Sequence, residues 1–162
     1  MASREIGNKD WRLSPRTKSA GDGVRATFFI MSKPVPVGAR AEVSETVEHK
    51  HTLTSHFKQL PPVYSTPDMI RLIETAAFLA LQPYAEGDEI NVGTKIDVEH
   101  RAATPLGAKV TAEAVVESFD GRFYTMRVRA WDDKQEIGRG TVGRAFVSVG
   151  KFMTKMQQNG SK

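Results

Sequence analysis

A hydroxyl, a carboxylate and an imidazole occupy positions in this chain from which they could act together. Thr66 precedes an apolar segment, Glu74 lies about two helical turns inside that segment, and His100 ends a later stretch with strand-like alternation. These side-chain types can supply a nucleophile, a base and a proton carrier for acyl transfer. If the three groups converge in space, we expect hydrolysis of an activated acyl compound.

Each of the three residues also has an ordinary structural explanation. Thr66 stands where a helix N-cap is expected, and His100 could be a hydrogen-bonded histidine at a strand end. Glu74 is harder to explain in this way, because a carboxylate on an enclosed helix needs a partner or a function. Arg71 is the one residue within a helical turn of Glu74 that could pair with it. The sequence alone leaves both readings open for each residue.

A single long helix is predicted over residues 67–82. Pro67 suits the first helical position, and Asp68 in the first turn complements the helix dipole. Apolar residues surround almost the whole helix: Met69, Ile70, Leu72, Ile73, Ala76, Ala77, Leu79, Ala80 and Leu81. A helix with this pattern is enclosed by other structure.

Strands are predicted from the alternation of polar and apolar residues. The alternating segments are residues 37–47, 91–100, 109–118, 122–131 and 137–149. Asp120 and Gly121 form a hairpin signal between the third and fourth of these segments. We therefore expect an α+β protein with the hot dog fold, in which one long central helix is wrapped by a curved antiparallel sheet of about five strands. An open sheet of this kind has an unpaired edge that a second copy could cover, so we expect a homodimer.

The phase of the alternation predicts which side chains face the helix. In the second strand the even-numbered residues form one face: Val92, Thr94, Ile96 and Val98. His100 continues this phase, so its imidazole is predicted on the buried side. In the last strand the predicted shared face carries Gly143, Ala145, Val147 and Val149. Charged residues of the sheet, such as Arg127 and Arg129, are assigned to a solvated face.

Net charge is concentrated at the two ends of the chain. The formal charge is +4, yet residues 1–25 and 151–162 each carry an excess of three basic residues, which leaves the rest slightly acidic. This distribution argues against a basic groove for nucleic acid. We expect a disordered basic arm over residues 1–25, a single domain over residues 26–155 and a flexible tail over residues 156–162.

Composition excludes several classes of site and of protein. The chain has no cysteine, which rules out a thiolate nucleophile and a cysteine zinc site. No apolar run is long enough for a membrane span, so we expect no membrane partner. The expected location is cytoplasmic, with a mitochondrial presequence as the alternative because the first residues are rich in arginine and serine. The histidines at 49, 51 and 56 lack the spacing of metal ligands, so we expect them to be solvated loop residues. We also expect no bound metal and no cofactor.

Three sequence runs resemble a known family. They are HRAATPLG at 100–107, EIGRGT at 136–141 and RA at 144–145. With the helix, they make the chain similar to the fluoroacetyl-CoA thioesterase group of hot dog thioesterases over roughly residues 35–155. The resemblance implies that Thr66, Glu74 and His100 are catalytic, and that the backbone amide of Gly93 lies near the thioester carbonyl. It implies an acyl-CoA thioesterase acting on a short or small acyl group.

Two further residues are candidate substrate contacts, Leu60 from its place in the family pattern and Arg101 from its position next to His100, where ordinary solvation is the alternative. The position six residues before Thr66 carries a bulky aromatic lid residue in the fluoroacetyl enzyme, whereas this chain has Leu60. Arg101 is a candidate contact for the CoA phosphates. A non-catalytic acyl-CoA-binding hot dog protein and a hot dog enoyl-CoA hydratase or dehydratase are the alternative functions, because one fold can host several chemistries.

Overall fold

A five-stranded antiparallel sheet is the scaffold of the protein in the computed structural model, which describes residues 34–159. The spatial order is β1-β3-β4-β5-β2, with every neighbouring pair antiparallel. The strands are β1 (Arg40–Thr46), β2 (Glu89–His100), β3 (Lys109–Phe119), β4 (Tyr124–Trp131) and β5 (Glu136–Ser148). The last three form the expected meander. The expected basic arm, residues 1–25, lies outside the described residues, as do residues 160–162.

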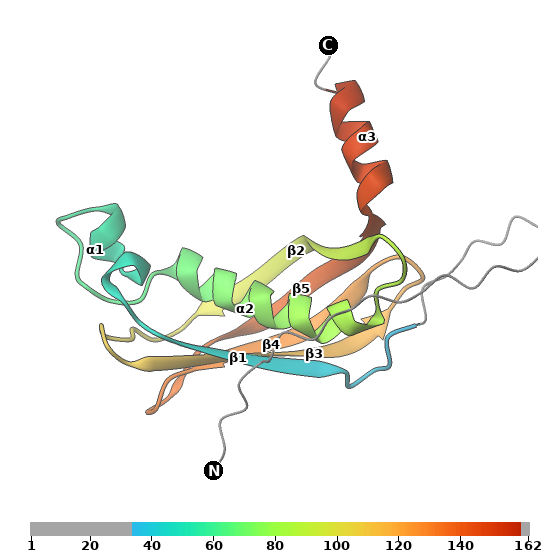
Figure 1. The fold of residues 1–162 in the computed structure, drawn as a ribbon. Coiled ribbons are helices and arrows are strands. Elements are labelled where there is room, and N and C mark those ends of the chain that lie inside the picture. The colour runs from blue at the N-terminus through green and yellow to red at the C-terminus, as the bar shows by residue number, and fades with distance from the viewer. Residues whose placement is uncertain (1–33, 160–162) are drawn as a thin grey trace, which may run out of the picture. The chain divides into compact units, whose positions relative to one another are not determined.

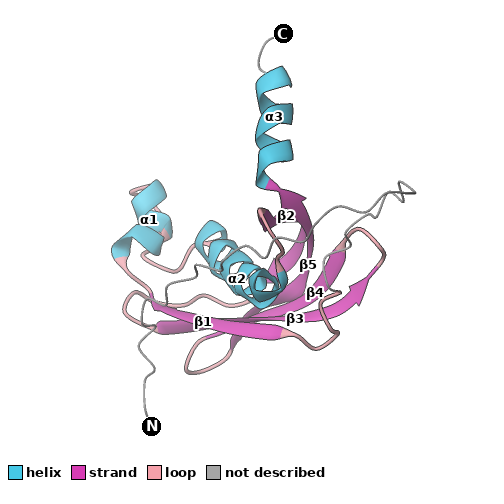
Figure 2. Cartoon of the chain, turned by 45° about the vertical axis from the view of Figure 1, so that its right-hand side comes forward, coloured by secondary structure: helices cyan, strands magenta, loops and turns pink. Residues whose placement is uncertain are grey.

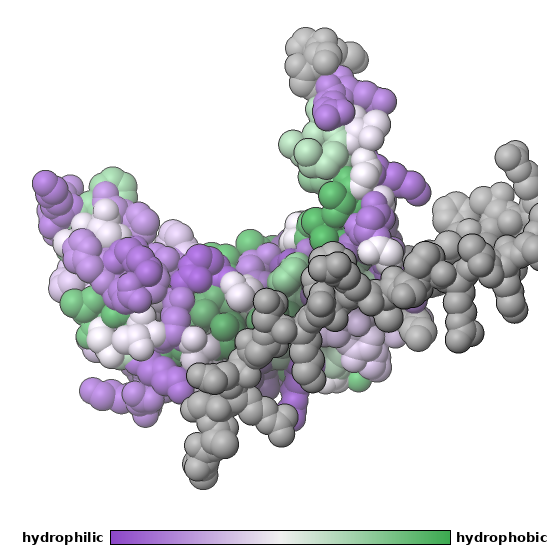
Figure 3. Space-filling view, viewed as in Figure 1, coloured by the Kyte–Doolittle hydropathy of each residue, from purple (hydrophilic) through white to green (hydrophobic). Residues whose placement is uncertain are grey.

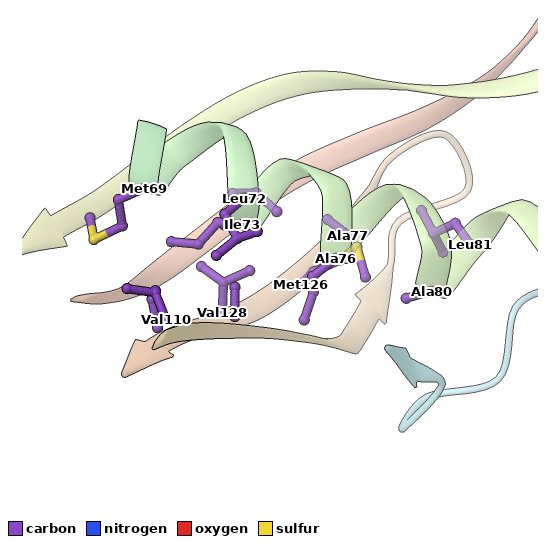
Figure 4. Packing of buried hydrophobic residues seen from close by; sticks show 14 of the residues in the cluster. Met69, Leu72, Ile73, Ala76, Ala77, Ala80, Leu81, Val110, Met126 and Val128 are labelled. Carbon is purple, nitrogen blue, oxygen red and sulfur yellow. The ribbon is translucent and has the colours of Figure 1, made fainter. Parts of the chain in front are cut away.

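The helix α2 (Thr66–Leu81) lies along one face of the curved sheet, as Figures 1 and 2 show. Its inward residues and those of the strands form one core (Figure 4). Residues that are at most 1% exposed include Met69, Ile73, Ala76, Leu81, Val110, Met126 and Val128. Burial of such apolar surface holds the helix against the sheet, and it thereby fixes the side chains that α2 presents at its borders. This arrangement is the predicted hot dog architecture.

The N-cap of α2 is Ser65, one residue earlier than predicted. The Ser65 hydroxyl accepts a hydrogen bond from the Asp68 backbone amide at 3.2 Å. Thr66 is therefore the first helical residue, and the capping role predicted for it is wrong. Because Ser65 satisfies the helix end, the Thr66 hydroxyl can bond elsewhere.

A β-bulge in β2 changes the predicted face of this strand. Gly93 pairs with Arg144 and Lys95 with Gly143, so Thr94 is an extra residue without a partner in β5. Before the bulge the helix-facing positions are odd-numbered, and Asn91 is buried. After the bulge they are even-numbered, and they end at His100. The predicted face is therefore right for the C-terminal half of the strand and wrong for Val92 and Thr94, because an extra residue reverses the alternation.

Two short helical turns contain the three histidines that were expected to be loop residues. They are η1 (His49–His51) and α1 (Leu53–His56). His51 is buried, accepts a hydrogen bond from the Glu48 amide at 3.1 Å, and packs edge-on against Tyr64. The expectation of solvated loop histidines is thus wrong for His51, whose ring stabilises this turn.

A third helix, α3 (Val149–Asn159), follows β5 directly and was not predicted. Residues 156–159 form its last turn, so the boundary expected at residue 155 does not match the secondary structure. The helix projects away from the sheet, and hydrophobic side chains are visible along it in Figure 3. The exposed apolar residues of α3 are Val149, Phe152, Met153 and Met156. Within residues 34–159, no helix has both the length and the apolar character of a membrane span.

Candidate active site

Thr66 and His100 form a direct hydrogen-bonded pair. The Thr66 Oγ1 atom lies 2.8 Å from Nδ1 of His100, which joins the first residue of α2 to the last residue of β2. A hydroxyl within hydrogen-bond reach of an imidazole is the arrangement in which a base activates a nucleophile. The two residues lie 34 positions apart in sequence, and they meet because α2 runs beside β2.

Burial lowers the pKa of His100 below the ordinary histidine value of 6.5, and a hydrogen bond with the Ala102 backbone opposes this shift. The ring is therefore neutral at pH 7 and can accept a proton. Its Nε2 atom is buried and has no hydrogen-bond partner among the described residues. A buried polar atom without a partner suits a group that bonds to substrate or to another subunit.

Glu74 lies in a second cluster with Arg144 and Gly93. Arg144 Nη1 donates to Glu74 Oε2 at 2.7 Å, whereas Glu74 Oε1 is buried without a partner in the described part of the chain. A Cβ atom at Gly93 would overlap the Glu74 carboxylate, so a larger residue here would displace this carboxylate from its present position. Arg71, the helical neighbour considered as a partner for Glu74, pairs instead with Glu45 at 2.5 Å.

The two clusters do not meet within one chain. Glu74 lies eight positions after Thr66 in α2, which corresponds to about 12 Å along the helix axis. No hydrogen bond joins Glu74 to Thr66 or His100 in the described residues. The single chain thus carries a hydroxyl–imidazole pair at the N-terminal end of α2 and a carboxylate–guanidinium pair beside the middle of this helix.

A pocket of about 320 Å³ opens beside the Thr66–His100 pair. Its walls are Leu53, Val63, Tyr64, Thr66, His100, Arg101, Ala102 and Ala103. Arg101 is exposed at this pocket, where a polar ligand could reach it. Leu60 is 38% exposed and does not line the pocket; Leu53 and Val63 supply its larger apolar walls.

Arg144 and Asn91 were missed as site residues in the sequence. Arg144 shares the helix-facing side of β5 with Val142, opposite Tyr124 in β4, and it is only 4% exposed. The predicted face of β5 was the odd-numbered one, and the charged residues of the sheet were assigned to solvent. The inward carboxylate of Glu74 was the available signal, because a buried acid requires a cation or a hydrogen-bond donor.

No group of three or more histidine, cysteine, aspartate or glutamate side chains within residues 34–159 could hold a metal ion. The polar groups that the structure brings together are instead a hydroxyl, an imidazole, a carboxylate and a guanidinium. Such a set can bind a carbonyl compound, attack it and move protons.

The helix on a sheet of order β1-β3-β4-β5-β2 places the chain among hot dog proteins, and solved structures agree. A thioesterase superfamily member from Thermus thermophilus aligns with a TM-score of 0.74 at 24% identity, covering 80% of this chain and 96% of that one. The fluoroacetyl-CoA thioesterase FlK aligns with a TM-score of 0.73 at 37% identity, covering 78% of this chain and 98% of FlK. The hot dog fold is confirmed.

Family comparison places the chain more narrowly. The model of the fluoroacetyl-CoA-specific thioesterase family matches residues 47–150. The fluoroacetyl-CoA thioesterase of Streptantibioticus cattleyicolor is 41% identical over 114 residues, which is 70% of this chain and 82% of that protein. The chain belongs to this family. Its class as an acyl-CoA thioesterase, expected from the sequence, is confirmed.

Proposed function

We propose that the chain hydrolyses small acyl-CoA thioesters with Thr66, His100, Glu74 and Gly93 as its catalytic groups. The observation that carries this proposal is the 2.8 Å hydrogen bond between the Thr66 hydroxyl and a His100 ring whose pKa is lowered. A neutral imidazole beside a hydroxyl can take its proton as the oxygen attacks.

In the proposed reaction the Thr66 oxygen attacks the thioester carbonyl carbon, and its proton passes to His100. The Gly93 amide stabilises the negative charge on the carbonyl oxygen. Collapse of this intermediate breaks the carbon–sulfur bond, and the thiolate of CoA leaves and takes up the proton. Water then attacks the threonine ester, and the unpartnered Oε1 of Glu74 takes a proton from it. The bond between the acyl carbon and Thr66 Oγ1 breaks, this oxygen takes up the proton, and the free acid is released.

The same atoms also allow a second mechanism, in which the nucleophile is the carboxylate of Glu74. In it the Glu74 carboxylate attacks the carbonyl carbon, the carbon–sulfur bond breaks and CoA leaves as the thiolate. Water then hydrolyses the resulting acid anhydride, and Thr66 positions the substrate. Rapid quenching followed by mass spectrometry distinguishes the two routes. An acyl group on the peptide that contains Thr66 supports the hydroxyl route, whereas label from heavy-oxygen water in the Glu74 carboxylate supports the anhydride.

The proposed substrates are acyl-CoA thioesters with short acyl groups. Structures of two FlK mutants have been solved, one in complex with acetyl-CoA and the other with fluoroacetate and CoA, which supports an acyl-CoA ligand for this relative of FlK. In this chain Leu60 stands at the position of the aromatic lid residue named above. We therefore propose that small acyl groups in general are hydrolysed, with no strict requirement for fluorine. Arg101, exposed at the pocket, would contact a CoA phosphate.

A homodimer would complete the site. Strand β2 is an edge strand of the sheet. Ile96, one of its helix-facing positions, is 50% exposed. Antiparallel pairing of β2 with its own copy about a two-fold axis near Ile96 and Asp97 would set Gly93 opposite the partner's His100. The carboxylate cluster of one chain would then lie beside the hydroxyl–imidazole pair of the other, which supports two composite sites per dimer.

The direct test measures release of free thiol from a panel of acyl-CoAs of increasing length, with acetyl-CoA and fluoroacetyl-CoA included. We expect turnover of the short thioesters and a loss of at least about 100-fold in kcat/KM for Thr66→Ala, Glu74→Gln and His100→Ala. Circular dichroism should show that each variant keeps the fold. Near wild-type kcat/KM in any of the three would remove that residue from the mechanism.

A further inference from the structure

The ion pair between Glu74 and Arg144 is held by a second set of contacts that centre on Asn91. The Arg144 side chain is 5% exposed, and its Nε atom donates to Asn91 Oδ1 at 2.6 Å. Its Nη2 atom donates to the Asn91 backbone oxygen at 3.2 Å. Asn91 thus accepts two hydrogen bonds from the Arg144 guanidinium, and they come from two of its three nitrogens.

Asn91 is itself fixed from the other side. Its Nδ2 group donates to the Phe78 backbone oxygen at 3.2 Å, in the last turn of α2, and to Oε1 of Gln82 at 2.9 Å, the residue that follows this helix. With both donors engaged by acceptors, the amide has one orientation, and its oxygen faces Arg144. Asn91 is 2% exposed, so water does not compete for these bonds.

These contacts determine which oxygen of Glu74 is available. A guanidinium is planar, so two bonds to Asn91 fix the direction of the third nitrogen. That nitrogen, Nη1, bonds Glu74 Oε2, and Oε1 is left as the buried atom without a partner. An arginine free to rotate could bind both oxygens at once, which is the common geometry of arginine with a carboxylate.

We propose that Asn91 is a positioning residue for the hydrolysis: it holds Arg144 so that Arg144 neutralises one oxygen of Glu74 and leaves the other for the reaction. The inference rests on the proposed role of Glu74. Asn91 does not touch the substrate, so it acts on the rate of the chemical step more than on substrate binding. A purely structural Asn91 would only tie β2 to the end of α2.

Two substitutions of Asn91 separate these roles. Asn91→Leu has similar volume but no acceptor for Arg144, and we expect kcat to fall at least 10-fold while KM stays within about 3-fold. Asn91→Asp keeps the acceptor for Nε and loses the donor to Gln82 and Phe78, so it should be less stable to heat than wild type yet retain at least a third of its kcat. If kcat instead falls in step with the melting temperature in both variants, the proposal is wrong.

Gln82→Met is the matched control, because it removes both hydrogen bonds that Asn91 donates to Gln82 Oε1, from its side-chain and backbone amides, and leaves the contacts of Arg144 in place. We expect a lowered melting temperature and a kcat within about 3-fold of wild type. A 10-fold loss of kcat in this control would point to the helix end in general and would overturn the assignment to Asn91.

A double-mutant cycle tests whether Asn91 acts through Arg144. In an Arg144→Met background, Asn91→Leu should lower kcat by no more than about 2-fold further; an equal loss in both backgrounds would contradict the proposal. The Glu74→Gln variant is measured in the same series. Full activity in Glu74→Gln would overturn the site assignment and this inference together, whereas an inactive Glu74→Gln beside a fully active Asn91→Leu would overturn this inference alone.

Discussion

Ser65 and Thr66 divide two tasks at the start of α2. The Ser65 hydroxyl accepts the Asp68 amide and caps the helix, while the hydroxyl of Thr66 bonds His100. Since both residues have similar side chains, their separate roles can be read from paired substitutions.

Thr66→Ala should abolish most of the thioesterase activity with little change in the free energy of unfolding. Ser65→Ala should lower the free energy of unfolding and keep most of the activity. Loss of a serine cap typically costs about 1 kcal/mol of unfolding free energy. Thiol release and urea unfolding measure the two effects. If Thr66→Ala lowers stability as much as Ser65→Ala and leaves activity intact, the Thr66 hydroxyl is structural.

The pH dependence of kcat/KM should follow His100. Because the pKa of His100 is below 6.5, its ring stays neutral to lower pH than that of an ordinary histidine. The acid limb of the kcat/KM profile should therefore have its midpoint below pH 6.5. His56→Gln, which removes a half-exposed histidine near Asp68, should leave the limb unchanged. An acid limb at or above 6.5 would contradict the assignment of His100 as the base.

The same shift predicts an effect on stability. The unfolded chain takes up a proton at His100 near pH 6.5, while the folded chain still resists it, so folding stability should fall as pH falls through 6.5. Urea unfolding between pH 5 and pH 8 measures this. The slope should be smaller in His100→Gln, and an unchanged slope would show that His100 does not contribute.

Gly93→Ala should damage both activity and stability. The added methyl group would overlap the Glu74 carboxylate and push it from Arg144, which we expect to cost about 1–3 kcal/mol of unfolding free energy and at least about 10-fold in kcat/KM. Gly150→Ala, where the nearest atom is Asp88 Oδ2 at 3.3 Å, is the control and should keep full activity. Normal kinetics in Gly93→Ala would rule out a close approach of substrate at this position.

Mixed dimers test whether the site is shared between chains. Glu74→Gln and His100→Ala are each expected to be inactive, but a heterodimer of the two should contain one intact composite site and recover about half of the wild-type activity. Co-expression with two affinity tags isolates the mixed species. An inactive heterodimer would place each site within one chain, and a monomer in light scattering would exclude the dimer itself.

The fold and about half of the candidate site could be predicted, because the sequence patterns that indicate them are periodic or involve neighbouring residues. The apolar helix, the alternating strands and the Asp120-Gly121 turn all follow short-range rules, and the structure contains them. The inward phase of His100 was also correct, because it depends only on the C-terminal half of β2.

Arg144 and Asn91 could not be predicted by the same rules. Both are polar residues on the helix-facing side of the sheet, and binary patterning assigns such residues to solvent. The burial of Arg144 is compensated by hydrogen bonds to Asn91 and Glu74, which lie 53 and 70 positions away in the sequence, and only the three-dimensional arrangement reveals such pairs.

The single extra residue in β2 links two groups that a regular strand could not present together. Gly93 and His100 are an odd and an even position, so in an uninterrupted strand they would point to opposite sides. Deleting Thr94 would shorten the chain by one residue at an exposed position, yet it would turn either the glycine or the imidazole to the opposite side of the sheet. We therefore expect relatives that share the proposed site to preserve the length of the segment between the two residues more strictly than its composition.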